Sequence, residues 1–247
     1  MHVDWATPWL CSLSLPAAMQ EALGRHGAVA ERLNAANGGQ PCAFVDDSGL
    51  PADRGYEQFI RSTGTIPTRD NLHDFFNGVV WLRFPRAKAR INELHVAELA
   101  RPRSDGRRGP VRDALTVFDE NGAALHAPPA LWDALTHRQW HRLFVDLRPL
   151  WREARLVVFG HALLEQLATA PRKPLTAHVL RADAPPADAA LDGWLAGQLA
   201  DARRLAAKPF TPLPVLGVPG WWPASEDAAF YGDTAVFRPA RGAQVTA

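Results

Sequence analysis

The chain has 247 residues, enough for one large domain or two small ones, and 47% of them are hydrophobic against 21% charged, which is ordinary for a globular protein. The formal net charge of +1 argues against a general affinity for nucleic acids or anionic membranes, and the apolar runs are too short to span a membrane. Two cysteines, Cys11 and Cys42, are too few for a disulfide framework, and with no signal-peptide pattern at the N-terminus they favour a cytoplasmic protein.

The first 70 residues predict short helices and one strand. GYEQFIRSTG at 55–64 is the clearest helix, because Gly64 stands where a helix end favours a positive φ. IPTRD at 66–70 predicts a turn, and Thr68 or Asp70 is the expected N-cap of the helix that follows. The other elements expected here are one or two helices over 15–37 and a strand at 41–47.

Residues 71–95, NLHDFFNGVVWLRFPRAKARINELH, predict two helices that meet at a sharp corner with almost no loop. Pro85 disfavours helical geometry at Phe84 and suits the first turn of a second helix. The first helix is apolar on most of its surface, so we expect it to be largely buried.

Polar side chains interrupt this apolar stretch in a regular pattern. His73 and Asn77 share a face of the first helix because they are four residues apart. Lys88, Asn92 and His95 form a polar stripe on the second helix. We expect the two polar faces to meet in one cluster at the Pro85 corner, where buried polar groups must be paired.

After residue 100 the pattern predicts a loop at 101–110 and then a β-hairpin in DALTVFDENGAALHAP at 113–128. Its turn would be Glu120-Asn121-Gly122, which would leave Asp119 and Glu120 in solvent. The remaining elements expected in chain order are a helix from 128 to about 144, a buried strand within 154–161 that runs into a helix beginning at His161, a strand at 175–183 and a helix at 191–206.

The segment 209–223, PFTPLPVLGVPGWWP, combines several prolines with many large apolar residues. Proline blocks regular backbone pairing, whereas a disordered tail would be polar and charged. We therefore expect an extended segment, called the strap below, that packs along the body, forms at most a short strand and helps to wall the pocket near His161.

These elements do not alternate as βαβ units. They predict an α+β fold over residues 1–247 as a single domain, mostly helical with a small sheet and the strap.

The chain lacks the glycine-rich phosphate loops, the HExxH and CxxC metal motifs and the GxSxG nucleophile elbow. The candidate site therefore depends on grouped polar residues. His161 joins the group because it follows a strand at the start of a helix, a frequent position for active-site residues. The seven candidate residues are His73, Asn77, Asn92, His95, Arg112, Asp113 and His161.

Two interpretations of this group remain open. In the first the protein is a hydrolase that uses acid–base or metal-assisted chemistry, because histidine can carry a proton near neutral pH or bind a divalent ion, and Arg112 would hold an anionic group. The spacing matches no named metal motif, so neither the cofactor nor any metal is specified. In the second the cluster fixes the helix corner and the protein is a non-enzymatic binding or structural protein.

The loop 101–112 holds arginines at 101, 103, 107, 108 and 112. Guanidinium groups bind phosphate and carboxylate groups, so a small anionic ligand is the partner expected at this loop. No aromatic residues are interleaved to stack on single-stranded nucleic acid, and the oligomeric state is left open.

Four segments resemble the bacterial family DUF3025. The resemblance implies a single-domain bacterial protein and supplies no activity, cofactor or site residue. The segments are TGTIPTRDNLHDFFNGVVWLRFPRAKARINELH at 63–95, RGPVRDALTVFDENGA at 108–123, VFGHALLEQL at 158–167 and PFTPLPVLGVPGWWP at 209–223.

Overall fold

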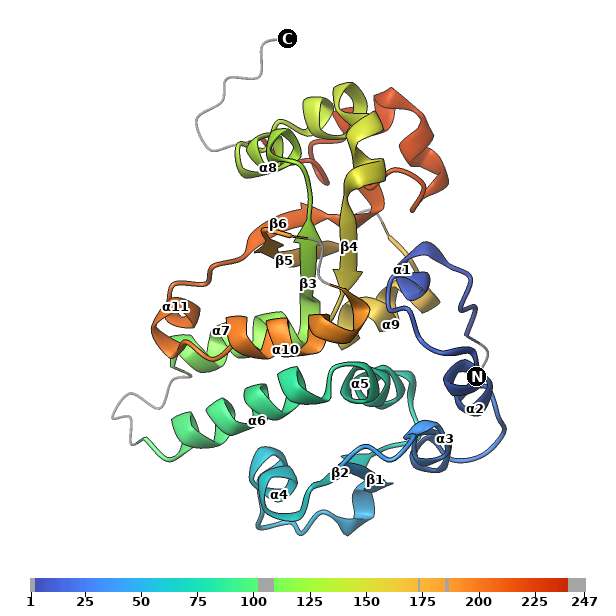
Figure 1. Ribbon diagram of the computed structural model, residues 1–247, viewed down its shortest axis with the longest axis vertical. Helices are drawn as coiled ribbons and strands as arrows, with labels where there is room; N and C mark the ends of the chain where they lie inside the picture. Colours follow the sequence, from blue (N-terminus) through green and yellow to red (C-terminus); the bar gives the residue numbers. More distant parts are fainter. Residues whose placement is uncertain (1–2, 102–108, 173, 185–186, 240–247) are drawn as a thin grey trace.

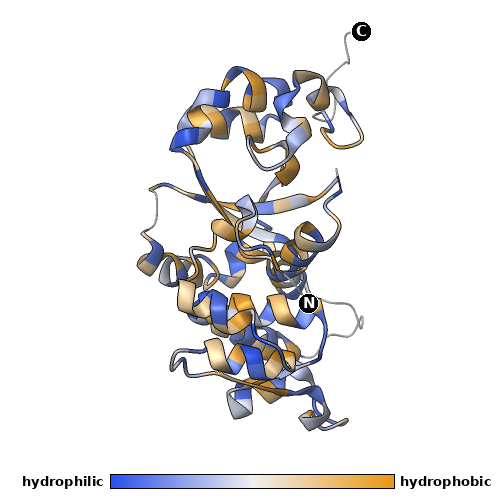
Figure 2. Cartoon of the chain, turned by 90° about the vertical axis from the view of Figure 1, so that its right-hand side faces the viewer, coloured by the Kyte–Doolittle hydropathy of each residue, from blue (hydrophilic) through white to orange (hydrophobic). Residues whose placement is uncertain are grey.

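The computed structural model describes residues 3–101, 109–172, 174–184 and 187–239. It is 56% helical and 12% strand, so the predicted α+β class is confirmed. The elements are stacked along the long axis of the molecule, with a small sheet between a cap of short helices and a larger group of helices (Figures 1 and 2).

The main sheet has four strands in the order β4-β3-β5-β6. The central strand β3 pairs with β4 antiparallel and with β5 parallel, and β6 adds to β5 antiparallel. Small and β-branched residues fill these strands, and Ala123, Val158 and Ala177 are fully buried. The strands are β3 (Gly122–His126), β4 (Arg155–Val158), β5 (Thr176–Ala182) and β6 (Thr211–Pro214).

One end of the sheet rests on helices that lead directly into or out of its central strands. Helix α7 (Pro110–Asn121) ends where β3 begins, and α9 (His161–Thr169) starts shortly after β4. Below them in Figure 1 lie α5 (Leu72–Arg83) and α6 (Pro85–Leu99), while α10 (Asp188–Gln198) runs beside α6. The last turn of α7 and the first turn of α9 therefore lie where the sheet meets the helices.

The N-terminal segments form the outermost layer. Helix α4 (Tyr56–Thr63) ends at Gly64, whose φ of 68° confirms the predicted helix end. Residues 66–70 were predicted as a turn, but Thr65–Thr68 is the strand β2, because Ile66 is buried opposite Phe44 in a parallel pair with β1 (Ala43–Asp46). The helices before β1 are α1 (Pro8–Cys11), α2 (Ala17–Leu23) and α3 (Val29–Ala36).

The predicted helix corner is confirmed, but its cap is a different residue. Phe84 leaves the helical region with φ −131° and ψ 57°, and Pro85 is the first residue of α6. The N-cap of α5 is Asn71, whose side chain accepts a hydrogen bond from the Asp74 amide at 2.8 Å. Asp70 instead accepts a bond from the Val29 amide, which ties the start of α3 to the start of α5.

The hairpin predicted over 113–128 is wrong in its first half, where the chain forms α7. Val111, Ala114, Leu115 and Phe118 are buried at helical spacing, and this burial outweighs the β preference of single residues such as Val117. The last turn of the helix therefore carries Asp119 and Glu120, which were expected in an exposed turn.

Two predicted helices are shorter than expected. The one from 128 to 144 ends as α8 (Pro129–Thr136), because Arg138 has a positive φ of 54°, and a π-helical turn (Arg142–Asp146) and a 3-10 helix (Arg148–Glu153) follow it. The one at 191–206 is divided between α10 and α11 (Ala202–Ala206), where Asp201 caps α11.

The strap is ordered and packed on the body, as predicted. Its residues 211–214 form β6, and Leu213, Val215 and Leu216 are fully buried. Tyr231 donates a hydrogen bond to the Gly217 carbonyl, which fastens the strap to the 3-10 helix Ala228–Gly232 that follows it.

No helix within the described ranges has both the length and the apolar character needed to cross a membrane. Residues 102–108 lie outside the described residues, so the anionic ligand expected at the arginine loop remains a prediction.

We expect Leu213→Ala to lower the free energy of unfolding by about 2–5 kcal/mol, because a fully buried leucine in the strap would leave a cavity. Urea unfolding followed by circular dichroism measures this change. The matched control is Leu99→Ala, since Leu99 is 41% exposed and its loss should cost less than about 0.5 kcal/mol. Equal losses in the two variants would contradict a strap that belongs to the core.

Candidate functional site

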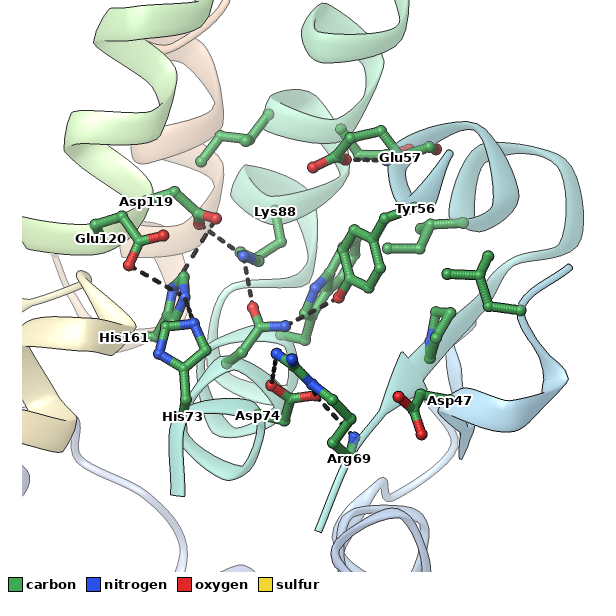
Figure 3. A pocket seen from close by; sticks show the side chains of 17 residues that line it. Asp47, Tyr56, Glu57, Arg69, His73, Asp74, Lys88, Asp119, Glu120 and His161 are labelled. Carbon is green, nitrogen blue, oxygen red and sulfur yellow. Dashed lines mark hydrogen bonds and ion pairs between the residues drawn. The ribbon is translucent and has the colours of Figure 1, made fainter. Parts of the chain in front are cut away.

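A cavity of about 430 Å³ lies where the helical layers meet (Figure 3). Its wall is built from α4, α5, α6, the last turn of α7 and the first residue of α9. Asp47 and Arg69 line it on the side of the N-terminal layer, and the side chain of Arg69 is 58% exposed while it pairs with Asp74. The cavity thus extends from buried polar groups to the surface.

Two histidines from different layers meet at one end of this cavity. The Nε2 atoms of His73 on α5 and His161 on α9 lie 3.1 Å apart, and the rings are edge to face with centroids 4.6 Å apart. The other ring nitrogen of His73, Nδ1, lies 3.0 Å from Oε2 of Glu165, one turn along α9 from His161. Glu165 therefore fixes the orientation of the His73 ring.

The last turn of α7 brings two carboxylates to the same point. Oε2 of Glu120 lies 3.5 Å from Nε2 of His161, and Oδ2 of Asp119 lies 3.9 Å from its Nδ1. His161 is only 4% exposed, so its ring is held between α5 and α7 with carboxylates facing both of its nitrogens.

A chain of hydrogen bonds continues from Asp119 along the cavity. The buried ammonium group of Lys88 donates to Oδ1 of Asp119 at 2.6 Å and to Oδ1 of Asn77 at 2.9 Å. Asn77 in turn donates to the Tyr56 hydroxyl at 3.1 Å. This chain joins α4, α5, α6 and α7 through side chains alone.

Glu57 and Asn92 form a second polar group further along the wall. The Asn92 amide donates to the backbone oxygen of Glu57 at 2.9 Å and to its carboxylate at 2.6 Å. Burial raises the pKa of Glu57 above its ordinary value, although the bond from Asn92 opposes this shift. The cavity therefore holds a carboxyl group that retains its proton to a higher pH than usual.

The carboxylates of α7 have pKa values shifted in opposite directions. Burial would raise the pKa of Asp119, but the charge and hydrogen bond of the Lys88 ammonium oppose burial, and the net effect lowers it. Burial and the charge of Asp119 raise the pKa of Glu120. Burial lowers the pKa of His161 to about 4, so its ring is neutral at pH 7.

A glycine makes this assembly sterically possible. A Cβ on Gly160 would lie 2.5 Å from the backbone of Glu120 and Asn121, so only glycine lets the start of α9 approach the end of α7 this closely. The amides of Phe159 and Gly160 both donate to the Gly122 oxygen, at 2.9 and 2.8 Å. His161 is therefore placed against Asp119 and Glu120 by the backbone itself.

The structure brings four of the seven predicted site residues to the cavity wall, namely His73, Asn77, Asn92 and His161. His95 is buried behind the wall, where its charge helps to lower the pKa of Asp119. Arg112 is half-buried and contributes only a small lowering of the Glu57 pKa. Asp113 turns away and pairs with Lys208 at 2.5 Å on the surface.

Asp119, Glu120, Glu57 and Tyr56 are cavity residues that the sequence prediction missed. The mistaken hairpin placed Asp119 and Glu120 in solvent. The spacing of Val111, Ala114, Leu115 and Phe118 was the available signal, because it predicts a helix with Asp119 and Glu120 at its end.

Three side chains of the cavity wall are grouped closely enough to hold a metal ion. His73, Glu120 and His161 each offer one ligand atom, and the three atoms lie within 4.8 Å of one another. Two imidazoles with one carboxylate are a common ligand set for divalent transition metals.

Comparison with known proteins identifies the family. The model described as "Protein of unknown function (DUF3025)" matches residues 42–241, so the chain belongs to this family and the resemblance predicted from the sequence is confirmed. No curated protein and no solved structure matches the chain.

We expect Gly160→Ala to lower the free energy of unfolding by about 1–3 kcal/mol, because the added Cβ must push α9 away from α7. Chemical unfolding measures the loss. Gly197→Ala is the matched control, since a Cβ there meets nothing within 4 Å and alanine is favoured inside a helix such as α10. A Gly160 variant as stable as the control would contradict the close approach.

The lowered pKa of His161 predicts a pH dependence of stability. Between pH 6.5 and about 4 the unfolded chain binds a proton at this residue that the folded chain does not, so its contribution to stability falls as the pH falls through this range. The loss is at most about 3–4 kcal/mol, since one pKa unit corresponds to about 1.4 kcal/mol.

Urea unfolding at pH 7 and pH 5, in buffer with a chelator, tests this contribution. The loss of stability on acidification should be larger for the native chain than for His161→Asn, which has no titrating ring at this position. The same pH slope in both proteins would show that His161 is not held neutral.

Proposed function

We propose that this DUF3025 protein is a hydrolase that activates water between His73, His161 and Glu120. The carrying observation is the meeting of two ring nitrogens, 3.1 Å apart, beside a carboxylate at the end of a cavity that reaches the surface. Free thiols at Cys11 and Cys42 support a reducing compartment, the bacterial cytoplasm, as its location.

Glu165 gives His73 the orientation that this role needs. Its carboxylate at 3.0 Å holds the ring proton of His73 on Nδ1, which leaves the lone pair of Nε2 facing the cavity. A carboxylate that fixes the tautomer of a catalytic histidine serves the same purpose in hydrolytic triads. A water molecule between His73 and Glu120 is then placed to lose a proton as it attacks the substrate.

Lys88 and Glu57 are suited to the other steps of hydrolysis. Lys88 has three N–H donors, of which two bond Asn77 and Asp119, and the third is available to the negative charge that develops on the attacked group. Glu57, with its raised pKa, is the group that gives a proton to the leaving atom.

The charges of the cavity favour a neutral or positively charged substrate. Arg69 and Lys88 are already paired with Asp74 and Asp119, whereas Glu120 adds a further carboxyl group to the wall. The volume of about 430 Å³ lies within the range of small-molecule sites. Small esters and amides without an acidic group are therefore the substrates to test first.

One observation favours the alternative of a binding or structural protein. The bonds from Lys88 to Asp119 and Asn77, and from Asn77 to Tyr56, tie four helices together, and breaking a buried charge pair costs about 3–5 kcal/mol. These residues thus have a structural role whether or not water is activated nearby. His73 is the better test, because its side chain is 37% exposed and makes none of these bonds.

We expect His73→Asn to reduce hydrolysis by at least about 100-fold, the usual contribution of an acid–base group, while the melting temperature changes little. The assay is a panel of chromogenic esters and aminoacyl amides of neutral and positive charge. The matched control is His137→Asn, because His137 also lies 3.2 Å from a carboxylate but on the exposed surface.

Turnover that falls only in the His73 variant supports a hydrolase. No turnover of any substrate by the native chain, or equal turnover in both variants, favours the structural alternative.

A further inference from the structure

Acid–base chemistry alone does not explain why the two histidines lie so close together. The proton that Glu165 holds on Nδ1 of His73 leaves its Nε2 as an acceptor. Oδ2 of Asp119 faces Nδ1 of His161 at 3.9 Å and favours a proton there too. Both Nε2 atoms then present lone pairs to each other at 3.1 Å, with the Glu120 carboxylate beside them.

We propose that His73, His161 and Glu120 bind one divalent transition metal ion of the zinc type. The ligand atoms are Nε2 of each histidine and Oε2 of Glu120, which the structure groups within 4.8 Å. Two imidazoles and one carboxylate leave a fourth position for water, as in catalytic zinc sites. The inference rests on the proposed function in that the ion would activate the attacking water, but it is tested by binding alone.

The distances between ligand atoms fit such an ion. Two Zn–N bonds of about 2.0–2.1 Å at the tetrahedral angle separate the nitrogen atoms by about 3.4 Å, close to the 3.1 Å between the histidines. The 3.5 Å between Glu120 and His161 fits equally well. The Glu120 side chain is 34% exposed, so it can turn toward His73 without disturbing the core.

The groups behind the ligands match those around known metal sites. A histidine ligand usually has a carboxylate or carbonyl oxygen at its other ring nitrogen, and Glu165 lies 3.0 Å from Nδ1 of His73. Nδ1 of His161 is buried without a hydrogen bond, and the nearest carboxylate to it in the described structure is Asp119 at 3.9 Å. Asp119 is itself oriented by its 2.6 Å bond from Lys88.

The local charge also favours a divalent cation. Asp119, Glu120 and Glu165 place three carboxylates around the two histidines, and Lys88 is the ammonium that contacts this group. A bound divalent ion would balance the remaining negative charge and provide an acidic water at neutral pH.

Equilibrium dialysis and calorimetry of the full chain, first stripped with a chelator, test the site with Zn²⁺ alone. We expect one Zn²⁺ per chain, and an affinity that falls at least about 10-fold in Glu120→Gln and in His73→Asn. Glu165→Gln should weaken binding about 10–100-fold without removing a ligand, which a merely structural role of Glu165 would not cause. His137→Asn is the matched control and should bind as the native chain does.

Co²⁺ gives a second readout, because a tetrahedral site with nitrogen ligands produces visible absorption bands that His73→Asn should lose. Melting curves of each variant verify that it is folded. Less than one Zn²⁺ per native chain, or an affinity unchanged in Glu120→Gln and His73→Asn, would overturn the proposal.

The two proposals can fail separately. Zinc binding without hydrolysis of any substrate would leave the metal site and remove the hydrolase. Hydrolysis by a metal-free chain that binds no Zn²⁺ would support the hydrolase and overturn the metal site.

Discussion

The close approach of two backbones at Gly160 is the constraint on which the candidate site depends. The start of α9 contacts the last turn of α7 so closely that a Cβ at Gly160 would overlap Glu120 and Asn121. Gly122 completes the junction, because its carbonyl accepts both amides of the Phe159-Gly160 segment and its own Cβ position is occupied by Phe118. The backbone alone therefore holds the end of α7 against the start of α9, whatever conformations the side chains adopt.

The second half of the site comes from a different layer and is held there by polar bonds. His73 lies on α5, and its bond to Glu165 on α9 joins the two helices. The corner at Pro85 sets the direction of α6, which carries Lys88 toward Asp119. A buried ammonium loses its hydration, so a chain selected for stability alone would favour apolar residues of similar size at such a position. The bonds from Lys88 to Asn77 and Asp119 offset this lost hydration, so the three side chains depend on one another.

The elements with strong local signals could be predicted from the sequence. The helix corner followed from Phe84-Pro85, the end of α4 from Gly64, and the buried strand β4 from its run of apolar residues. The ordered strap followed from its composition, but the prediction that it helps to wall the pocket near His161 is wrong. The residues that line the cavity come from positions 47–161, so within the described chain the strap lies behind the wall, where Phe210 stacks on Phe118.

The site could be predicted only in part, for a specific physical reason. His73, Asn77, Asn92 and His161 were found because helical spacing or a strand–helix junction marked them. Asp119 and Glu120 were missed because Glu120-Asn121-Gly122 looks like a hairpin turn, whereas in the structure Gly122 ends α7 and its missing Cβ makes room for Phe118. Local sequence also does not show that Gly160 serves a close contact with Glu120 and Asn121, which come much earlier in the chain. The omission of Asp119 matters most for the candidate site. Its two oxygens face Lys88 and His161, so one carboxylate links the hydrogen bonds of Lys88 to the two histidines.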